Sequence, residues 1–366
     1  MIRVALIGTG AIAVQNHIPG IRLHPRGEVA ALCDSNPGAL QAASAASGVT
    51  RTFTDYRAVI AQRDIDAVVI ATPNHLHSPI ALAAIDAGKH VMCEKPLGMN
   101  HSETEAMALA AARAGVVHMT AFTYRFVPAI RWMHALMREG TLGALYHVRV
   151  RRLQDWSDAA LGWRQERALA GSGELGDMLA HRIDYVHYLV GSFTRIVAHT
   201  KQCLAQRRRP DGTLQPSDVE DWVAVIGEVT GGATAVLEST KMATGRGSGG
   251  QGEDFVELNG SDGTLIYRLE RPHELLIGRP GGSLEPRGVP EALLTVAGSP
   301  RNPHEGDPLQ AFRYDQGFEF VQAIAEGRPA SPDFFDGSRT QAVLDAILVS
   351  AERREWVDVV DTRIPA

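Results

Sequence analysis

A glycine-rich turn between a strand and a helix opens the chain. The apolar run Val4–Ile7 is followed at once by the letters GTGAIA. Two glycines allow a tight turn that a pyrophosphate can approach, and the N–H groups of the next helix favour its negative charge. The pattern predicts a dinucleotide-binding βα unit, and a turn without a ligand is the alternative. The predicted contacts are Gly8, Gly10, Ala11 and Ile12.

A second apolar run, Val29–Cys33, ends at Asp34, about 20 residues beyond the turn. A carboxylate at this position would accept hydrogen bonds from the adenosine ribose. No arginine stands in the next five residues, 35–39, so a 2′-phosphate would meet a negative charge without a counter-charge. We therefore expect NAD as the cofactor, with NADP less favoured.

The chain has 366 residues, which is longer than single cores usually grow. Apolar runs alternate with Ala-rich stretches over residues 1–122, which predicts an α/β Rossmann domain that binds NAD. Residues 123–366 predict an α+β domain with an open, mainly antiparallel sheet for substrate binding and oligomerisation. We expect helices over Phe312–Ala325 and Ser338–Glu352 to pack on this second domain.

Composition excludes several other classes of protein. The formal net charge of −6 would repel a phosphate backbone, so nucleic acid is not expected as a partner. Three scattered cysteines form no C-x-x-C pair, which argues against disulfides and thiolate metal sites. No signal peptide or apolar run of 18 residues is evident, so we expect a cytoplasmic protein without membrane contact.

Two further strand ends carry polar residues. The run Ala67–Ala71 leads into Thr72, Pro73, Asn74 and His77, at the edge where such sheets bind ligands. Asn74 and His77 are interpreted equally well as cofactor contacts or as helix caps.

The run His90–Cys93 leads into Glu94, Lys95 and Pro96. Because a residue before proline is extended, Lys95 should project from the strand end. Beside a cationic nicotinamide its pKa would fall, so it could exchange a proton with an alcohol.

A helix expected over Asp177–Val190 carries the second polar group. At helical spacing, Asp177, His181, Asp184 and Tyr188 form one stripe. A carboxylate one turn from an imidazole can orient it as a general base. A metal site is the less favoured interpretation, because only His187 remains as a further ligand and no convergent set is evident.

The chain resembles the Gfo/Idh/MocA family, which includes glucose-fructose oxidoreductase and inositol dehydrogenase. The resemblance runs essentially from end to end, through GTGAIA at Gly8, TPNHLH at Thr72, EKP at Glu94, GWR at Gly162 and D-x-x-x-H-x-x-D at Asp177. It implies a catalytic group of Lys95, Asp177 and His181.

The resemblance also implies a cis peptide before Pro96, Arg164 near the cofactor, and a homodimer or homotetramer formed through the second domain's sheet. Ser172, in a turn where the family has glycine, is a minor departure. Thr123 and Tyr124 replace residues where the family often has Asn, which leaves a substrate contact by the neighbouring Arg125 open.

Trp163 is expected near cofactor and substrate, where it could stack on a sugar ring, although core packing explains it equally well. Arg207–Arg209 is interpreted as a solvated hairpin, and Thr244–Gly252 as a mobile loop of unassigned role.

These features together predict an NAD-dependent enzyme that oxidises a secondary hydroxyl of a sugar, sugar derivative or inositol to a ketone. The alternatives are an NAD-dependent glycosidase, which the presence of Lys95 disfavours, and a non-catalytic NAD sensor. The sequence does not select the sugar, the hydroxyl, the direction of reaction, or a dimer over a tetramer.

Overall fold

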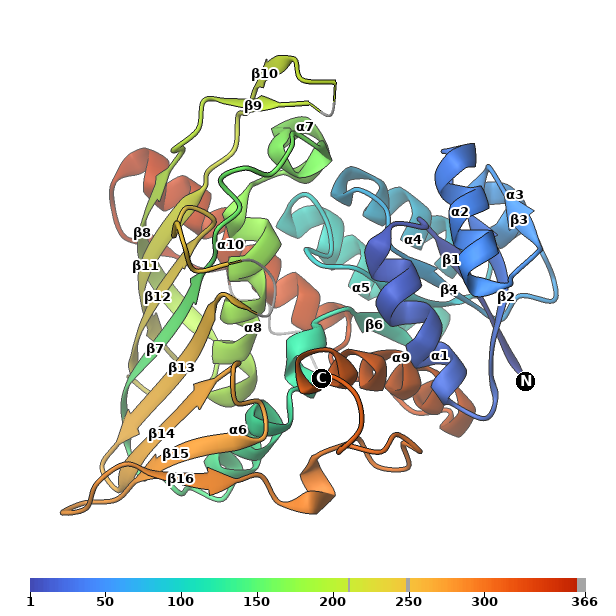
Figure 1. The fold of residues 1–366 in the computed structure, drawn as a ribbon. Coiled ribbons are helices and arrows are strands. Elements are labelled where there is room, and N and C mark those ends of the chain that lie inside the picture. Colours follow the sequence, from blue (N-terminus) through green and yellow to red (C-terminus); the bar gives the residue numbers. More distant parts are fainter. Residues whose placement is uncertain (210, 248–250, 361–366) are drawn as a thin grey trace. The chain divides into compact units, whose positions relative to one another are not determined.

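The computed structural model describes residues 1–209, 211–247 and 251–360 (Figure 1). The chain forms two compact units, each with its own sheet. The first contains Met1–Phe126 and Thr295–Ser338, and the second contains Val127–Leu294 and the chain from Arg339 onward.

The sheet of the first unit is parallel, as predicted. Its strands lie in the order β3-β2-β1-β4-β5-β6. They are β1 (Ile2–Ile7), β2 (Gly27–Cys33), β3 (Thr52–Phe53), β4 (Ala67–Ile70), β5 (His90–Cys93) and β6 (His118–Thr120). All four residues of β4 are fully buried, which is typical of a parallel strand covered on both faces.

Helices connect and cover these strands. They are η1 (Ala13–His17), α1 (Ile18–Leu23), α2 (Pro37–Ser47), α3 (Tyr56–Ile60), η2 (Asn74–Leu76), α4 (His77–Asp86), α5 (His101–Ala114), η3 (Thr123–Phe126) and α9 (Pro308–Glu326). Asn36 caps α2 by accepting from the backbone N of Gly38 and Ala39. Asn100 caps α5 in the same way, through the backbone N of Glu103.

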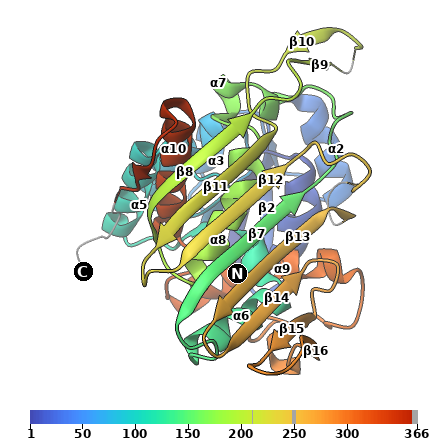
Figure 2. The same ribbon diagram turned by 90° about the vertical axis from the view of Figure 1, so that its left-hand side faces the viewer.

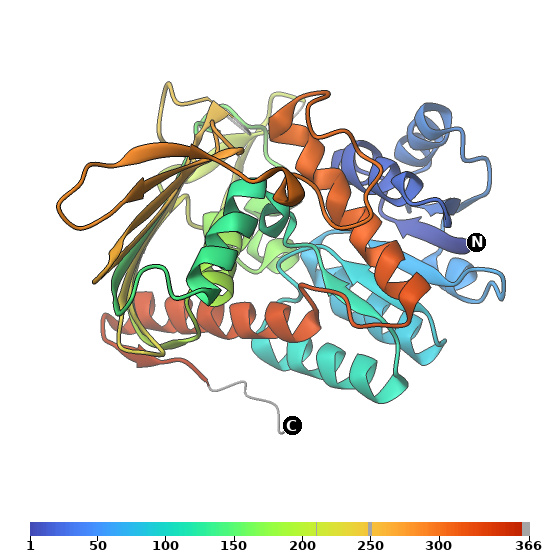
Figure 3. The same cartoon turned by 90° about the horizontal axis from the view of Figure 1, so that it is seen from below.

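Helix α9 lies in the first unit, whereas the sequence analysis placed all residues after 122 in the second domain. Figure 3 shows α9 (orange) beside α1 (dark blue). Gly20 of α1 meets Gly317 of α9 so closely that a Cβ on Gly317 would lie 2.8 Å from the Gly20 carbonyl carbon. The physical reason for the difference is this tight helix crossing, which periodicity within one segment cannot reveal.

The second unit contains a nine-stranded sheet in the order β16-β15-β14-β13-β7-β12-β11-β8-β17 (Figure 2). Among the described strands β7 and β12 pair in parallel and the other neighbours pair antiparallel, which confirms the predicted open, mainly antiparallel sheet. The strands are β7 (Leu145–Leu153), β8 (Phe193–Lys201), β11 (Trp222–Val229), β12 (Thr234–Thr240), β13 (Glu253–Gly260), β14 (Gly263–Arg268), β15 (Glu274–Gly278), β16 (Glu285–Gly288) and β17 (Val357–Asp358).

Helices cover one face of this sheet, and α6 and α8 lie against it in Figure 1. The helices are α6 (Pro128–Arg138), η4 (Trp163–Gln165), α7 (Arg167–Ala170), η5 (Leu175–Leu179), α8 (Ala180–Leu189), η7 (Glu291–Leu293) and α10 (Phe334–Arg353), of which α10 begins in the first unit. Burial alternates along β7, with Val148, Val150 and Arg152 inward. The opposite face exposes Ile226 and Val236, which are paired across β11 and β12.

A small hairpin, β9 (Gln206–Arg208) and β10 (Leu214–Pro216), stands apart from this sheet. The hairpin was predicted, but its solvated character was wrong for Arg207, which is buried and pairs with Asp221 at 2.8 Å. Pro210, and Ser248 to Gly250 of the predicted mobile loop, lie outside the described residues. No helix in the described part of the chain is long and apolar enough to cross a membrane.

Candidate active site

The glycine-rich turn packs against the end of β4. Gly8 has φ +94°, and a Cβ there would lie 2.4 Å from the carbonyl oxygen of Ala71, so only glycine fits. Around Gly10 no atom of the described residues lies within 4 Å of a Cβ position. Ala11 and Ile12 begin the helix that continues through η1. The turn thus combines close backbone packing on one side with open space on the other.

Asp34 is anchored to this turn. Its Oδ2 accepts from the backbone N of Thr9 at 2.8 Å and from Thr9 Oγ1 at 2.9 Å, and its Oδ1 accepts from the backbone N of Asn36 at 2.9 Å. A carboxylate has about four acceptor sites, two on each oxygen, so one remains on Oδ1 for a further donor such as a ribose hydroxyl. The structure therefore brings Asp34 and the glycine-rich turn together.

The ends of β4 and β5 are joined through His77. Its side chain is fully buried, with Nδ1 2.9 Å from the carbonyl oxygen of Pro96 and Nε2 3.0 Å from that of Thr72. Burial lowers the pKa of His77, which favours the neutral ring, and because that ring carries one N–H it donates to one of these two carbonyl oxygens at a time. His77 does not cap α4, because the helix has no side-chain cap, and it links the two predicted loops instead. Asn74 is also buried, at the start of η2.

Glu94 connects the Lys95 segment to the helix after the glycine-rich turn. Its Oε1 lies 2.8 Å from His17 Nε2, and its Oε2 accepts from the backbone N of Lys95 at 3.3 Å. Although burial acts to raise it, the hydrogen bond and charge of His17 hold the pKa of Glu94 below its usual range. The Lys95–Pro96 peptide is cis, as the resemblance implied.

These residues fit a dinucleotide. The glycine-rich turn leaves space beside a helix start, an anchored carboxylate lies next to it, and Thr72 Oγ1 is a buried hydroxyl without a hydrogen-bond partner among the described residues. Gly8, Gly10 and the helix start at Ala11–Ile12 would hold the pyrophosphate, and Asp34 would hold the ribose. Lys95 and the Thr72–Pro73 segment follow the carboxyl ends of the neighbouring strands β5 and β4.

The second unit carries the predicted acid–base residues. Asp177 lies on η5, a π-helical turn of the kind often found at functional sites. Its Oδ2 is 3.1 Å from Lys241 Nζ, and its Oδ1 is 3.7 Å from Arg164 Nε. The Arg164 guanidinium stacks over the Trp163 ring, with its carbon 4.3 Å from the ring centre. The structure thus brings the GWR segment to Asp177.

Beneath Asp177 lies a carboxyl that the sequence analysis missed. Glu174 is fully buried, its Oε1 accepts from Ser239 Oγ, and its Oε2 is 3.8 Å from Lys241 Nζ. Burial raises the pKa of Glu174 to about 7. Nearby Glu220 accepts from the backbone N of Gly173 and Leu175, which fixes the start of this helix.

The helix that bears His181 is covered on both its polar and its apolar side. His181 and Asp184, of the predicted stripe, and Ile183, predicted to point away from it, are all buried. The π-helical turn before it also departs from the 3.6-residue period on which the stripe depended. Tyr188 stacks on His134, with ring centres 3.9 Å apart.

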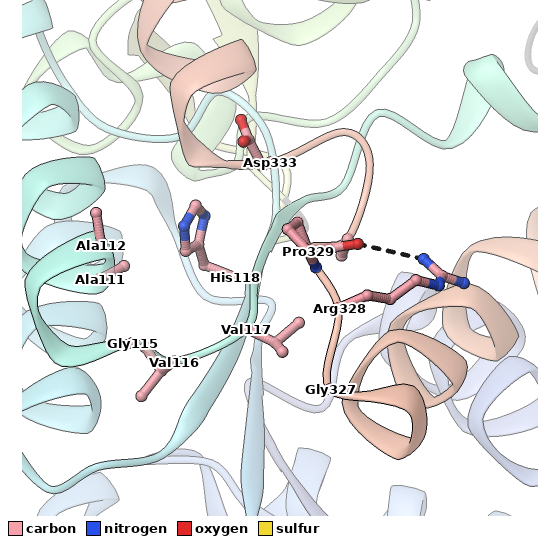
Figure 4. A pocket seen from close by; sticks show the side chains of 11 residues that line it. Ala111, Ala112, Gly115, Val116, Val117, His118, Gly327, Arg328, Pro329 and Asp333 are labelled. Atoms are coloured by element: carbon pink, nitrogen blue, oxygen red, sulfur yellow. Dashed lines mark hydrogen bonds between the residues drawn. The ribbon is translucent and has the colours of Figure 1, made fainter. Parts of the chain in front are cut away.

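Arg125 and one pocket lie in the first unit. Arg125 is buried and pairs with Asp336 at 3.1 Å, which fixes the start of α10 to η3. The pocket in Figure 4 is lined by His118, the first residue of β6, and by Arg328, which pairs with Glu319. It therefore lies at the amino ends of the strands, opposite Lys95, and contains none of the predicted site residues.

The described residues contain no group of three or more His, Cys, Asp or Glu that could hold a metal. His17, Glu174 and Lys241 are the site residues that the sequence analysis missed. His17 carried a weak signal, because it lies on the helix after the glycine-rich turn. Lys241 carried no signal in the sequence, because its partners Asp177 and Glu174 are distant from it along the chain.

The fold and these two groups of residues define an NAD-binding oxidoreductase. The family model "Oxidoreductase family, NAD-binding Rossmann fold" matches residues 2–122, and "GFO/IDH/MocA C-terminal domain" matches residues 130–266. The chain belongs to the Gfo/Idh/MocA family of dehydrogenases that act on sugar hydroxyls.

Several relatives match nearly the whole chain. A levoglucosan dehydrogenase of Pseudarthrobacter phenanthrenivorans is 35% identical over 355 residues, covering 90% of this chain and 88% of the relative. Inositol 2-dehydrogenase of Rhizobium meliloti is 26% identical, covering 97% and 98%. The solved structure of levoglucosan dehydrogenase with NADH and levoglucosan has a TM-score of 0.88 at 33% identity, covering 98% of this chain and 99% of that one.

Proposed function

We propose that the protein oxidises a secondary hydroxyl on the ring of a sugar, sugar derivative or cyclitol to a ketone, with NAD as the oxidant. The observation that carries this proposal is the position of Lys95, two residues after the end of β5, at the sheet edge where the glycine-rich turn and Asp34 lie. Bound NAD would supply the hydride acceptor.

The chain's own residues supply binding and proton transfer. Lys95 and His181 act as the acid–base pair that takes the hydroxyl proton. Asp177 orients the His181 imidazole for that transfer. The Glu94 carboxylate accepts a hydrogen bond from the backbone N of Lys95, and His77 Nδ1 lies beside the carbonyl oxygen of Pro96. Trp163 and Arg164 offer a ring face and a cation beside Asp177, which suits a polyhydroxylated ring.

A panel assay tests the reaction. Reduction of NAD and NADP is followed with levoglucosan, simple aldoses, sugar acids and inositols, with levoglucosan first because its dehydrogenase is among the relatives that match nearly the full chain. We expect NADH and an equal amount of ketone from at least one of them. Cleavage of a glycoside without net NADH would instead support the glycosidase alternative.

Substitution of Lys95 tests the mechanism. Lys95→Ala should bind NADH normally and lose about 10²-fold or more in kcat, as expected when acid–base catalysis is removed. The exposed Lys201→Ala is the matched control and should retain full turnover. A Lys95→Ala enzyme with near-normal kcat would remove Lys95 from the mechanism.

We also propose that the protein works as a homo-oligomer through the sheet face that exposes Ile226 and Val236. These two side chains are cross-strand neighbours, and adjacent exposed apolar side chains are typical of an interface. Light scattering of the wild type and of Ile226→Lys checks this, and a wild-type monomer would contradict it.

A further inference from the structure

The second unit contains one buried ammonium between two carboxyl groups. The exposed fraction of the Lys241 side chain is 7%, that of Glu174 is 0% and that of Asp177 is 21%. Lys241 follows β12, while Glu174 and Asp177 lie at the start of the η5 helix. The ammonium therefore lies on the buried side of Asp177, and the half-exposed Arg164 approaches the same carboxylate at 3.7 Å.

The charges of this cluster are not balanced if both carboxyl groups ionise. Lys241 is 3.1 Å from Asp177 and 3.8 Å from Glu174, so it pairs first with Asp177. Glu174 has a hydroxyl partner in Ser239 and is the more deeply buried carboxyl. An ionised carboxylate without a close counter-charge is costly at such a position, so Glu174 is the group that keeps a proton.

The other charged groups around the cluster are already engaged. Arg182 of α8 binds Asp254 of β13 with its Nε at 3.2 Å from Oδ1, and both side chains are fully buried. Glu220, before β11, accepts from two backbone N–H groups and lies 4.0 Å from Arg167.

The remaining neighbours leave Lys241 as the close cation. Arg164 of η4 reaches Asp177 at 3.7 Å, and His181, the imidazole of the predicted catalytic group, follows Asp177 by four residues in the chain and lies on α8. Lys241 is thus a buried cation in direct contact with Asp177, with its Nζ 3.1 Å from Oδ2.

A buried ion pair contributes little net stability, because removing both charges from water costs about as much as their attraction returns. A lysine placed here therefore calls for a functional explanation. Although burial acts to lower it, the charges of Asp177 and Glu174 raise the pKa of Lys241 above its ordinary value, so the ammonium stays charged.

We propose that Lys241 is a positioning residue, which holds the Asp177 carboxylate ionised and in place for catalysis, and that neutral Glu174 keeps the ammonium on Asp177. The proposal rests on the proposed function, since it assigns Asp177 to the reaction. When Glu174 ionises, Lys241 is shared between two carboxylates and its hold on Asp177 weakens.

Kinetics of three variants test the proposal. Lys241→Met should lower kcat by about 10-fold to 10²-fold, leave NADH binding unchanged, and shift the acid limb of the kcat/KM profile to higher pH, because Asp177 has lost its cation. Lys241→Arg should recover part of kcat and should shift the acid limb of the kcat/KM profile less than Lys241→Met does. Glu174→Gln should remove an inflection near pH 7 and keep substantial turnover.

The matched control is Lys89→Met. Lys89 is also a buried lysine, but its Nζ donates to the backbone carbonyls of Gln62 at 2.8 Å and Ile65 at 2.6 Å in the first unit. We expect a lower melting temperature with an unchanged pH profile. A Lys241→Met enzyme with the wild-type profile, or a Lys89→Met enzyme with the same shift, would overturn the proposal.

Thermal melting against pH gives a readout that needs no substrate. The folded pKa of Glu174 lies above its unfolded value, so its contribution favours folding at low pH and is lost as the pH rises toward about 7. Glu174→Gln should flatten this loss, and Lys241→Met should move it to higher pH. If no sugar reduces NAD, the proposed function fails while this titration still tests the cluster, and identical melting curves for wild type and Glu174→Gln would refute the neutral Glu174.

Discussion

At the scale of single residues, Asp34 is oriented before any ligand arrives. Thr9, in the middle of the glycine-rich turn, donates to it from both its backbone and its side chain. The carboxylate therefore loses little side-chain freedom on binding, and the acceptor site that remains on Oδ1 is held in place by the turn that would bind the pyrophosphate.

This arrangement predicts the cofactor preference. In the wild type, kcat/KM with NAD should exceed that with NADP by about 30-fold or more, since a repulsion of about 2 kcal/mol between a carboxylate and the 2′-phosphate gives that ratio. Asp34→Asn should narrow the ratio at least about 10-fold. Initial rates with both cofactors measure it.

Thr9→Val is the matched control, because it removes one donor to Asp34 and keeps the charge. It should change KM for NAD modestly and leave the preference intact. Tighter use of NADP by the wild type would contradict the assignment of Asp34 to the ribose.

At the scale of elements, the crossing of α1 and α9 depends on two glycines. A Cβ on Gly20 would lie 2.6 Å from the carbonyl oxygen of Tyr314, and one on Gly317 would lie 2.9 Å from the backbone N of Ile21. These are backbone contacts, which cannot yield as a flexible side chain can.

Gly317→Ala should therefore lower the free energy of unfolding of the first unit by about 1–3 kcal/mol, the range for overpacked sites. An unconstrained helical glycine replaced by alanine would instead gain up to about 1 kcal/mol, so the sign alone is informative. Gly288→Ala, where nothing lies within 4 Å of the added Cβ, is the control and should be near neutral. Denaturant titration provides the comparison, and a stabilised Gly317→Ala protein would disprove the tight crossing.

The elements also show what sequence could predict. The parallel strands and the candidate residue Lys95 could be predicted from the sequence, because their signals are local: apolar runs, glycines and a lysine before proline. The ion pair of Lys241 with Asp177 and the buried ion pair of Arg207 with Asp221 could not be predicted, because each depends on a partner brought close only by the folded sheet. The π-helical turn at Leu175–Leu179 also departs from the period used to group the stripe on α8.

At the scale of the whole molecule, the glycine-rich turn, Asp34 and Lys95 lie in one compact unit, and Trp163 and Arg164 lie in the other. Bound NADH should therefore slow hydrogen exchange at the glycine-rich turn, at the end of β2 and in the segment from Thr72 to η2, since ligand binding stabilises the state that it binds. Exchange in the β14–β16 region should stay unchanged. Mass spectrometry with and without NADH measures exchange in both regions. Protection confined to β14–β16 would contradict the assignment of the cofactor site to the glycine-rich turn.

The first unit is assembled from two stretches of chain separated by most of the second, because α9 packs on α1. During synthesis the ribosome must therefore complete the chain beyond Glu326 before α1 can meet its partner, although the six strands and the glycine-rich turn have emerged long before. A fragment ending at Phe126 would leave the Gly20 surface of α1 uncovered, so we expect it to be prone to aggregation. A separately expressed NAD-binding unit would need residues 295–338 joined to it by a linker.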